Sequence, residues 1–145
     1  MTTNPKNRVV VYTDGGAIDN PGPAAISTII ETTGKLFPKQ YSEKIGNATN
    51  NEAEYKALIF ALRKLKSLFG KKKIKNLEVK CYLDSKLLVE QLNGIYKILE
   101  RDLQPLFLEV WNLKIDFKNV SFNYVPREEN KEADKLVKEE LSNFK

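Results

Sequence analysis

Apolar and polar residues follow each other along this chain in patterns that predict a mixed α/β fold. Arg8–Thr13 is a nearly continuous apolar run, typical of a central strand that is covered on both faces. Two more strands are predicted over Ala25–Glu31 and Lys35–Lys44, joined by a tight connection at Thr33-Gly34. Pro38 cannot donate a ladder hydrogen bond, so the third strand is expected at a sheet edge.

The next segment predicts a helix that starts at Thr49 and stops at Gly70. Thr49 stands three residues before Glu52, which is the capping-box spacing, and glycine is a common helix terminator. Apolar residues recur at helical spacing within it and are expected to form its buried stripe: Ala57, Leu58, Ala61, Leu62, Leu65 and Leu68.

The second half of the chain alternates strands and helices. After a basic loop at 71–76, the pattern predicts strands over Leu77–Leu83 and Val120–Val125, and helices over Ser85–Leu92, about Leu103–Phe117 and Glu129–Leu141. This order favours right-handed parallel crossovers. The expected architecture is one α/β domain over residues 1–145, whose mixed sheet combines an antiparallel hairpin with parallel strands and carries helices on both faces.

Composition narrows the possible chemistry. The chain of 145 residues has no histidine, which excludes histidine bases, Ser-His or Cys-His nucleophiles and His-ligated zinc. Its only cysteine, Cys81, forms no internal disulfide; with no visible secretory signal or membrane-length apolar run, this predicts a cytoplasmic protein. The net charge of +5 suits a polyanionic partner but is also common for solubility alone.

Four acidic residues fall where an α/β fold places functional groups. Asp14 and Asp84 each directly follow a predicted strand, and if those strands are parallel neighbours both carboxylates emerge at the same sheet end. Glu54 lies on the buried stripe of the first long helix, where an unpaired charge is costly. Asp134 lies at the edge of the apolar face of the last helix. Simpler interpretations are a turn or cap for each aspartate, and an i,i+4 pair with Lys138 for Asp134.

Like charges that converge in one cleft repel each other unless a multivalent cation neutralises them. Ligands that are all oxygen favour Mg²⁺ or Mn²⁺. Two such ions about 4 Å apart would suit in-line attack on a phosphodiester. The acidic pattern therefore predicts metal-dependent phosphodiester hydrolysis.

In four segments the chain resembles the type 1 ribonuclease H family. The segments are YTDGGAIDNPGPA, TNNEAEYKALIFAL, YLDSKLLVEQLNG and VPREENKEADKLV, in this order and spread over essentially the whole chain. The resemblance implies a five-stranded mixed sheet and endonucleolytic cleavage of the RNA strand of RNA/DNA hybrids. It also implies 5′-phosphate and 3′-hydroxyl products, a requirement for Mg²⁺ or Mn²⁺, and two ions when substrate is bound. The family's acidic quartet corresponds here to Asp14, Glu54, Asp84 and Asp134.

The same resemblance assigns substrate contacts. Backbone and side-chain contacts to 2′-hydroxyls, bases and a DNA phosphate correspond to Gly15, Gly16, Ala17, Asn20, Thr49, Asn50 and Asn51. Small residues let the backbone approach the minor groove, where the 2′-hydroxyl distinguishes RNA from DNA. Helix capping is the alternative interpretation of the two adjacent asparagines.

The chain departs from the family pattern in two places. Many members carry a histidine before the last helix, where this chain has VPREEN, so Arg127 is the nearest candidate for that role. The long basic protrusion of bacterial relatives is replaced by a short segment, and Lys86 is a candidate for part of its function, although a solvated lysine explains the same residue.

The sequence leaves several alternatives open. The predicted protein is a monomeric ribonuclease H that needs no protein partner and binds no membrane. The rivals are a non-catalytic hybrid- or double-stranded-RNA-binding domain of the same fold, and a related nuclease or retroelement-type fragment of a larger protein. Double-stranded RNA stays a candidate second substrate because it presents the same 2′-hydroxyl groups.

Overall fold

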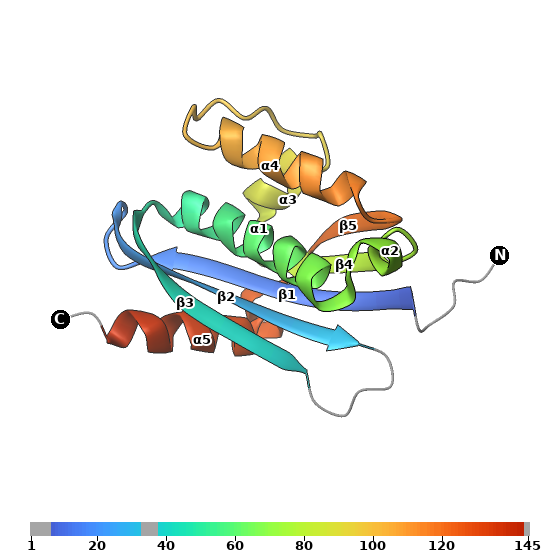
Figure 1. Cartoon of the computed structure of the whole chain (residues 1–145). Coiled ribbons are helices and arrows are strands. Elements are labelled where there is room, and N and C mark those ends of the chain that lie inside the picture. The colour runs from blue at the N-terminus through green and yellow to red at the C-terminus, as the bar shows by residue number, and fades with distance from the viewer. Residues whose placement is uncertain (1–6, 33–37, 144–145) are drawn as a thin grey trace.

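The computed structural model describes residues 7–32 and 38–143, which include a five-stranded sheet (Figure 1). The strands are β1 (Arg8–Ala17), β2 (Gly22–Thr32), β3 (Lys39–Ala48), β4 (Glu78–Leu83) and β5 (Asn119–Tyr124). Their spatial order is β3-β2-β1-β4-β5, with β1/β2 and β2/β3 antiparallel and β1/β4 and β4/β5 parallel. The predicted mixed sheet is therefore confirmed, and β1 lies at its centre.

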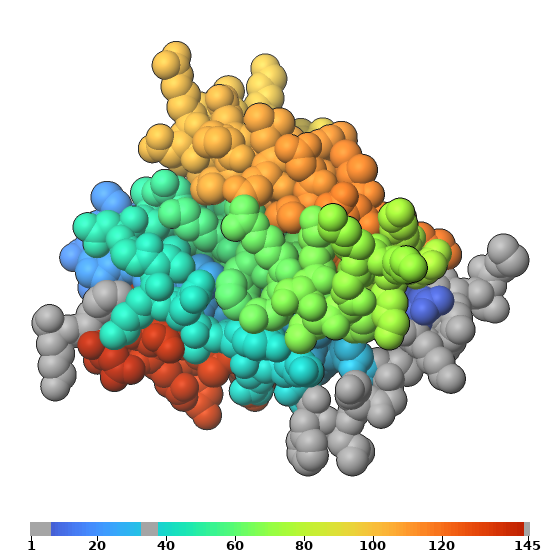
Figure 2. All heavy atoms as spheres, in the orientation of Figure 1, coloured from blue at the N-terminus to red at the C-terminus, as the bar shows by residue number. Residues whose placement is uncertain are grey.

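Helices cover both faces of this sheet, as the element order predicted. They are α1 (Asn50–Phe69), α2 (Lys71–Ile74), α3 (Lys86–Leu92), α4 (Gln104–Ile115) and α5 (Lys131–Ser142), with a 3₁₀ turn at Arg127–Glu129 before α5. Helices α1, α3 and α4 lie on one side of the sheet and α5 on the other (Figure 1). In the space-filling view, α4 in orange packs directly against α1 in green, and α5 in red lies along the opposite side of the molecule (Figure 2).

The core lies between the sheet and α1. Val9 and Val11 of β1 pack with Leu58 and Leu62 of α1, and all four are essentially inaccessible to solvent. Along β4 the predicted alternation holds, because Val79, Cys81 and Leu83, like Leu77 just before the strand, are buried. Burial of apolar surface at about 25 cal/mol per Å² makes this layer the main source of stability.

Helix α1 begins and ends where its sequence predicted. The Thr49 hydroxyl accepts a hydrogen bond from the Glu52 amide at 3.1 Å, and a Glu52 carboxylate oxygen accepts one from the Thr49 amide at 2.9 Å. Gly70 ends the helix with φ 84°, a conformation that favours glycine. The expected buried stripe is confirmed except for Leu68, which is 41% exposed in the last turn of α1, where Phe69 and not Leu68 packs against the core.

Both predicted ends of the third strand are wrong. The edge strand runs over Lys39–Ala48 instead of 35–44, because β2 begins at Gly22, and its first residues pair with the chain as far as Ala48. Pro38 precedes this strand, whose edge position is confirmed. The predicted Thr33-Gly34 connection lies outside the described residues.

Other differences concern short helices. The segment predicted as a basic loop at 71–76 contains α2, because Ile74 is buried and fixes one helical turn against the core. The last helix begins at Lys131, after the 3₁₀ turn, and not at Glu129. Among the described residues, no helix combines the length and the apolar character that crossing a membrane requires.

Candidate active site

Two of the predicted carboxylates lie side by side at one end of the sheet. Parallel pairing aligns Tyr12 of β1 with Tyr82 of β4, so Asp14 and Asp84, each two residues further on, emerge at the same end. Asp14 is only 8% exposed. The prediction that these strands are parallel neighbours is confirmed.

Strand β1 does not stop at Thr13, where the apolar run ends. It continues to Ala17, and Asp14, Gly15, Gly16 and Ala17 pair with β2 in antiparallel register. Residues 14–17, which lie beyond the predicted end of this strand, therefore belong to it. This pairing holds the Asp14 backbone rigidly although the parallel pairing with β4 has already ended.

Helix α1 supplies the third carboxylate. One oxygen from each of Asp14, Glu54 and Asp84 can be chosen so that all three lie within 4.8 Å of one another. These side chains come from a strand interior, a helix and a strand end that are far apart in sequence. The fold thus brings together three of the four acids that the sequence singled out.

Gly15 makes this convergence possible. A Cβ atom added at Gly15 would lie 2.4 Å from both the backbone carbon and the backbone oxygen of Ala53, the residue before Glu54. Strand β1 and helix α1 therefore touch backbone to backbone at this point. The resemblance assigns Gly15 to substrate binding; the structure also gives it a packing role.

Gly15→Ala is expected to lower the free energy of unfolding by about 1–3 kcal/mol, the usual cost of overpacking, because the backbone of α1 must move. Gly16→Ala is the matched control, since its added Cβ would meet its nearest neighbour, a Val137 methyl, at an ordinary 3.6 Å. Urea unfolding of both variants measures the difference. Equal stability of Gly15→Ala and the natural protein would contradict the proposed close contact.

The electrostatics of the site penalise the ionised acids. Burial, together with the negative charges of Asp84 and Asp134, raises the pKa of Asp14 to about 8. Burial, together with the charges of Asp14 and Asp84, raises the pKa of Glu54 to about 8. A hydrogen bond from Ser85 to Glu54 and one from the Gly15 amide to Asp14 oppose these shifts only in part.

Asp134 lies near this cluster but outside the set of three. Its negative charge raises the pKa of Asp14, so the two carboxylates interact electrostatically. One of its oxygens also lies 2.9 Å from the Lys138 ammonium, which is the i,i+4 pair that the sequence offered as the simpler interpretation. Asp134 therefore both pairs with Lys138 and lies close enough to Asp14 to affect its pKa.

Arg127 lies in the 3₁₀ turn before α5, and its side chain is exposed. Its positive charge lowers the pKa of Asp14 and of Glu54, which places the guanidinium within electrostatic reach of the carboxylates. Its positive charge therefore opposes the burial and repulsion that raise both pKa values.

The predicted substrate-binding asparagines form a hydrogen-bonded chain at the rim of the site. The Asn50 side-chain oxygen accepts a hydrogen bond from the Ala17 amide at 2.8 Å, and the Asn20 side-chain oxygen accepts one from the Asn50 amide at 2.9 Å. Asn51 donates to Glu100 at 3.5 Å. The Ala17–Asn50 bond fixes the end of β1 against the start of α1, and the other two tie α1 to the segment after β1 and to the one before α4.

The remaining candidates, Thr49 and Lys86, lie at helix starts. Thr49 caps α1, and Lys86 is the exposed first residue of α3, whose N-cap is Ser85. Capping of α1 is therefore one role of Thr49, and the phosphate contact that the resemblance assigns to it stays a prediction.

Asn130 is a site residue that the sequence did not reveal. Its side-chain nitrogen donates to an Asp84 carboxylate oxygen and to the Thr13 carbonyl, both at 3.0 Å. An asparagine directly before a helix ordinarily indicates an N-cap. Nothing in the local sequence distinguishes an N-cap from a residue whose side chain donates to a distant strand. Asp134, four residues later and itself a predicted site residue, was the one indication that the start of this helix faces the site.

Comparison with known proteins identifies the family. A family model described as reverse transcriptase-like matches residues 12–140. Ribonuclease HI of Halobacterium salinarum is 36% identical over 92% of this chain and 64% of its own length. A solved structure of LC11-RNase H1, isolated from compost by a metagenomic approach, is 40% identical, covers 94% of this chain and 96% of that one, and superposes with a TM-score of 0.86.

The chain belongs to the type 1 ribonuclease H family. Another solved structure shows LC11-RNase H1 in complex with an RNA/DNA hybrid; it is 41% identical, covers 92% of this chain and 96% of that one, and has a TM-score of 0.85. A bifunctional protein of Mycobacterium tuberculosis is 34% identical over 92% of this chain, which spans 35% of that protein's length. The family resemblance stated from four short segments is therefore confirmed over nearly the whole chain.

Proposed function

We propose that this protein is a metal-dependent endonuclease that hydrolyses the RNA strand of RNA/DNA hybrids. The observation that carries the proposal is the convergence of Asp14, Glu54 and Asp84 within 4.8 Å in a member of the ribonuclease H family. Complexes of a relative with an RNA/DNA hybrid support the substrate class.

The donor set fits Mg²⁺ or Mn²⁺. The three side chains offer only carboxylate oxygens, which are the ligands that these hard cations prefer. Burial, together with repulsion between the neighbouring carboxylates, raises the pKa of Asp14 and of Glu54 to about 8. A divalent cation bound by these oxygens would offset both the repulsion and the lost hydration. Asp14, Glu54 and Asp84 are the proposed ligands, with Asp134 as the fourth carboxylate of the site.

When bound, a pair of divalent ions supplies activated water for in-line attack and neutralises the charge that develops on the leaving oxygen. The expected products are a 5′-phosphate and a 3′-hydroxyl. The protein's contribution is positional: β1 holds Asp14 rigidly, and α1 holds Glu54 against it. Such precision matters because small displacements of reacting groups cost large factors in rate.

The rim next to the carboxylates is the proposed hybrid-binding surface. Backbone atoms of Gly15, Gly16 and Ala17 and the side chains of Asn50 and Asn51 are the candidates for reading the RNA strand, with Asn20, Thr49 and Lys86 as further contacts. The bonds Ala17–Asn50 and Asn50–Asn20 support this assignment because they pre-order the surface before any ligand arrives. We infer a cytoplasmic monomer for which the hybrid is the principal partner.

Four labelled nucleic acids, three duplexes and one single strand, test the substrate proposal. In Mg²⁺ or Mn²⁺, the protein is expected to cut the RNA strand of a hybrid and leave both a DNA duplex and single-stranded RNA intact. Of these three, only the hybrid presents the 2′-hydroxyls of an RNA strand in the minor groove of a duplex. An RNA duplex in the same series decides whether that substrate is also cut. Tight hybrid binding without turnover under either metal would identify the non-catalytic alternative.

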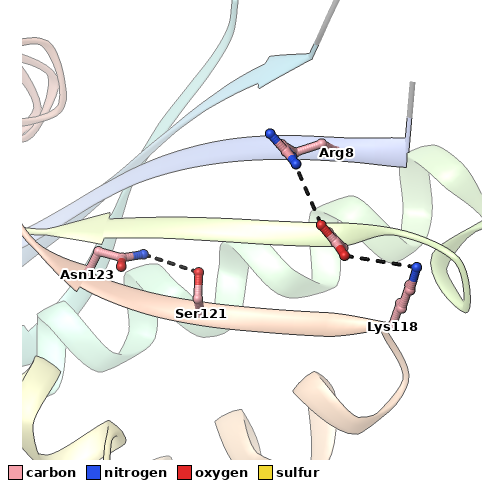
Figure 3. Close-up of polar contacts among 5 residues, drawn as sticks. Arg8, Lys118, Ser121 and Asn123 are labelled. Carbon is pink, nitrogen blue, oxygen red and sulfur yellow. Dashed lines mark hydrogen bonds and ion pairs between the residues drawn. The ribbon is translucent and has the colours of Figure 1, made fainter. Parts of the chain in front are cut away.

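Arg127→Ala is expected to lower kcat for hybrid cleavage more than it lowers the apparent affinity for Mn²⁺. The guanidinium can bind phosphate or stabilise developing negative charge, but it is a poor proton donor. Steady-state kinetics over a range of Mn²⁺ concentrations separate the two effects. Arg8→Ala is the matched control, since Arg8 begins β1 at the other end from Asp14 and lies 4.0 Å from Glu78 (Figure 3). An unchanged kcat for Arg127→Ala would remove this residue from the mechanism.

A further inference from the structure

Asn130 occupies an unusual position between α5 and the sheet. It is the residue directly before α5, yet it is only 2% exposed. Its side-chain nitrogen has two hydrogens, and both are used: one hydrogen bond reaches Asp84 and the other reaches the Thr13 carbonyl, each at 3.0 Å. One amide therefore joins the residue before Asp14 to the carboxylate that follows β4.

This side chain does not act as a helix cap. The Asn130 side chain accepts no hydrogen bond from the first turn of α5, which is what an N-cap asparagine normally does. Its side-chain oxygen is buried and finds no hydrogen-bond partner within the described residues. A buried acceptor without a partner costs stability, so its presence in a native structure calls for an explanation.

The two hydrogen bonds that the Asn130 side-chain nitrogen donates explain why an amide with an unpartnered oxygen stands here. A neutral amide can orient the Asp84 carboxylate without cancelling its charge, whereas a lysine or arginine in this place would compete with a metal cation. An aspartate in this place would add repulsion. Asn130 also directly precedes the helix that carries Asp134, whose amide donates to the Asn130 carbonyl at 3.1 Å.

We propose that Asn130 is a positioning residue that orients the Asp84 carboxylate for metal binding and ties the start of α5 to the ends of β1 and β4. This inference rests on the proposed function, because it takes Asp84 as a metal ligand. Asn130 itself acts through Asp84 and Thr13, not through the substrate. The geometry predicts that its loss weakens metal binding and turnover more than it weakens substrate binding.

Asn130→Leu and Asn130→Ala test the proposal. Leucine keeps a similar volume and removes both the donors and the unpartnered oxygen, so it tests the bond without leaving a cavity. Outer-shell partners of metal ligands typically contribute 10–100-fold in affinity or activity. Calorimetric titration with Mn²⁺ is expected to show affinity reduced by about this factor in both variants. The kcat for hybrid cleavage should fall while KM for the hybrid stays within about threefold, since the bond touches a metal ligand and not the substrate.

Asn123→Ala is the matched control. Asn123 on β5 also donates to a backbone carbonyl of a neighbouring strand, that of Cys81, at 3.2 Å. It donates to the Ser121 hydroxyl as well, again at 3.2 Å (Figure 3). Like Asn130, it donates to a backbone carbonyl of a strand, but it has no carboxylate partner in the described part of the chain. Its variant is expected to bind Mn²⁺ and to cleave hybrid as the natural protein does, whatever change appears in its thermal midpoint.

Two results would overturn the inference. One is Mn²⁺ affinity and kcat in Asn130→Leu equal to those of the natural protein. The other is a parallel loss of thermal midpoint, Mn²⁺ affinity and kcat in Asn130→Leu and Asn123→Ala, which would show a purely structural role. If the natural protein binds Mn²⁺ but cuts no hybrid, the proposed function fails separately, and the calorimetric comparison still tests Asn130.

Discussion

Asp14→Asn is expected to abolish hybrid cleavage and, at pH 8 without divalent metal, to raise the stability of the protein. The substitution keeps the shape of the side chain but removes its carboxylate. Asp14 is only 8% exposed, and its carboxylate lies close to those of Glu54 and Asp84. Loss of cleavage should exceed roughly 100-fold, the upper end of what loss of an outer-shell partner costs, because Asp14 is a proposed direct ligand.

The gain in stability has a different cause. In the metal-free protein, Asp14 must either ionise against its neighbours or hold a proton at pH 8, and both cost free energy. An asparagine avoids this cost. The expected gain in the free energy of unfolding is at least about 1.4 kcal/mol, the equivalent of one pKa unit.

Thermal or urea unfolding at pH 8 with a chelator present measures this gain. Asp116→Asn is the matched control, because Asp116 is an exposed aspartate that pairs with Lys66 at 2.6 Å, away from the cluster. That variant should cut hybrid normally and gain no stability. A loss of stability in Asp14→Asn would show that Asp14 is not held in a repulsive cluster.

The second large effect concerns pH and metal together. The folded-state pKa values of Asp14 and Glu54 are both raised to about 8, from ordinary values of 3.8 and 4.5. The folded state therefore binds more protons than the unfolded state between about pH 4 and pH 8. By linkage, the stability that these groups contribute is fully present below pH 4 and is lost as the pH rises toward 8.

Metal-free protein is accordingly expected to lose free energy of unfolding as the pH rises from about 5 to 8, and Mn²⁺ or Mg²⁺ should restore it at pH 8. A ligand that binds only the folded state stabilises it by mass action, about 2.7 kcal/mol at 100 times its dissociation constant. Unfolding scans at several pH values, with and without metal, make the measurement. Equal metal-induced stabilisation in Asp14→Asn would argue that the ion binds elsewhere.

The sequence predicted the carboxylate cluster because simple periodicities control where its members point. Asp14 and Asp84 follow strands, and Glu54 precedes Leu58 by four residues on one helix face, so the topology alone brings them near one another. The helical pattern also placed Asp134 at the edge of the apolar face of the last helix. The resemblance to the family then assigned the four acids to one site and added the substrate-binding residues. The same periodicities identified the central strand and the capped start of α1.

The remaining features depend on contacts between distant segments, which no local pattern encodes. The extension of β1 through Gly15 and Gly16 arises from pairing with β2, although glycine by itself favours a turn. The contact between Gly15 and Ala53 needs the packed helix, and Asn130 looks like an ordinary cap until Asp84 is placed beside it. The helix α2 was missed because one buried residue, Ile74, outweighs the lysines around it.

Single-turnover cleavage of a hybrid with a 5′-labelled RNA strand tests the central claim most directly. The natural protein and Asp84→Asn are compared in excess Mn²⁺ and again with a chelator, with enzyme in excess over hybrid so that binding does not limit the rate. We expect the natural protein to cleave the RNA strand in Mn²⁺ and not with the chelator, and we expect no detectable cleavage by Asp84→Asn under either condition. Equal rates for the two proteins, or a rate for the natural protein that the chelator leaves unchanged, would contradict it.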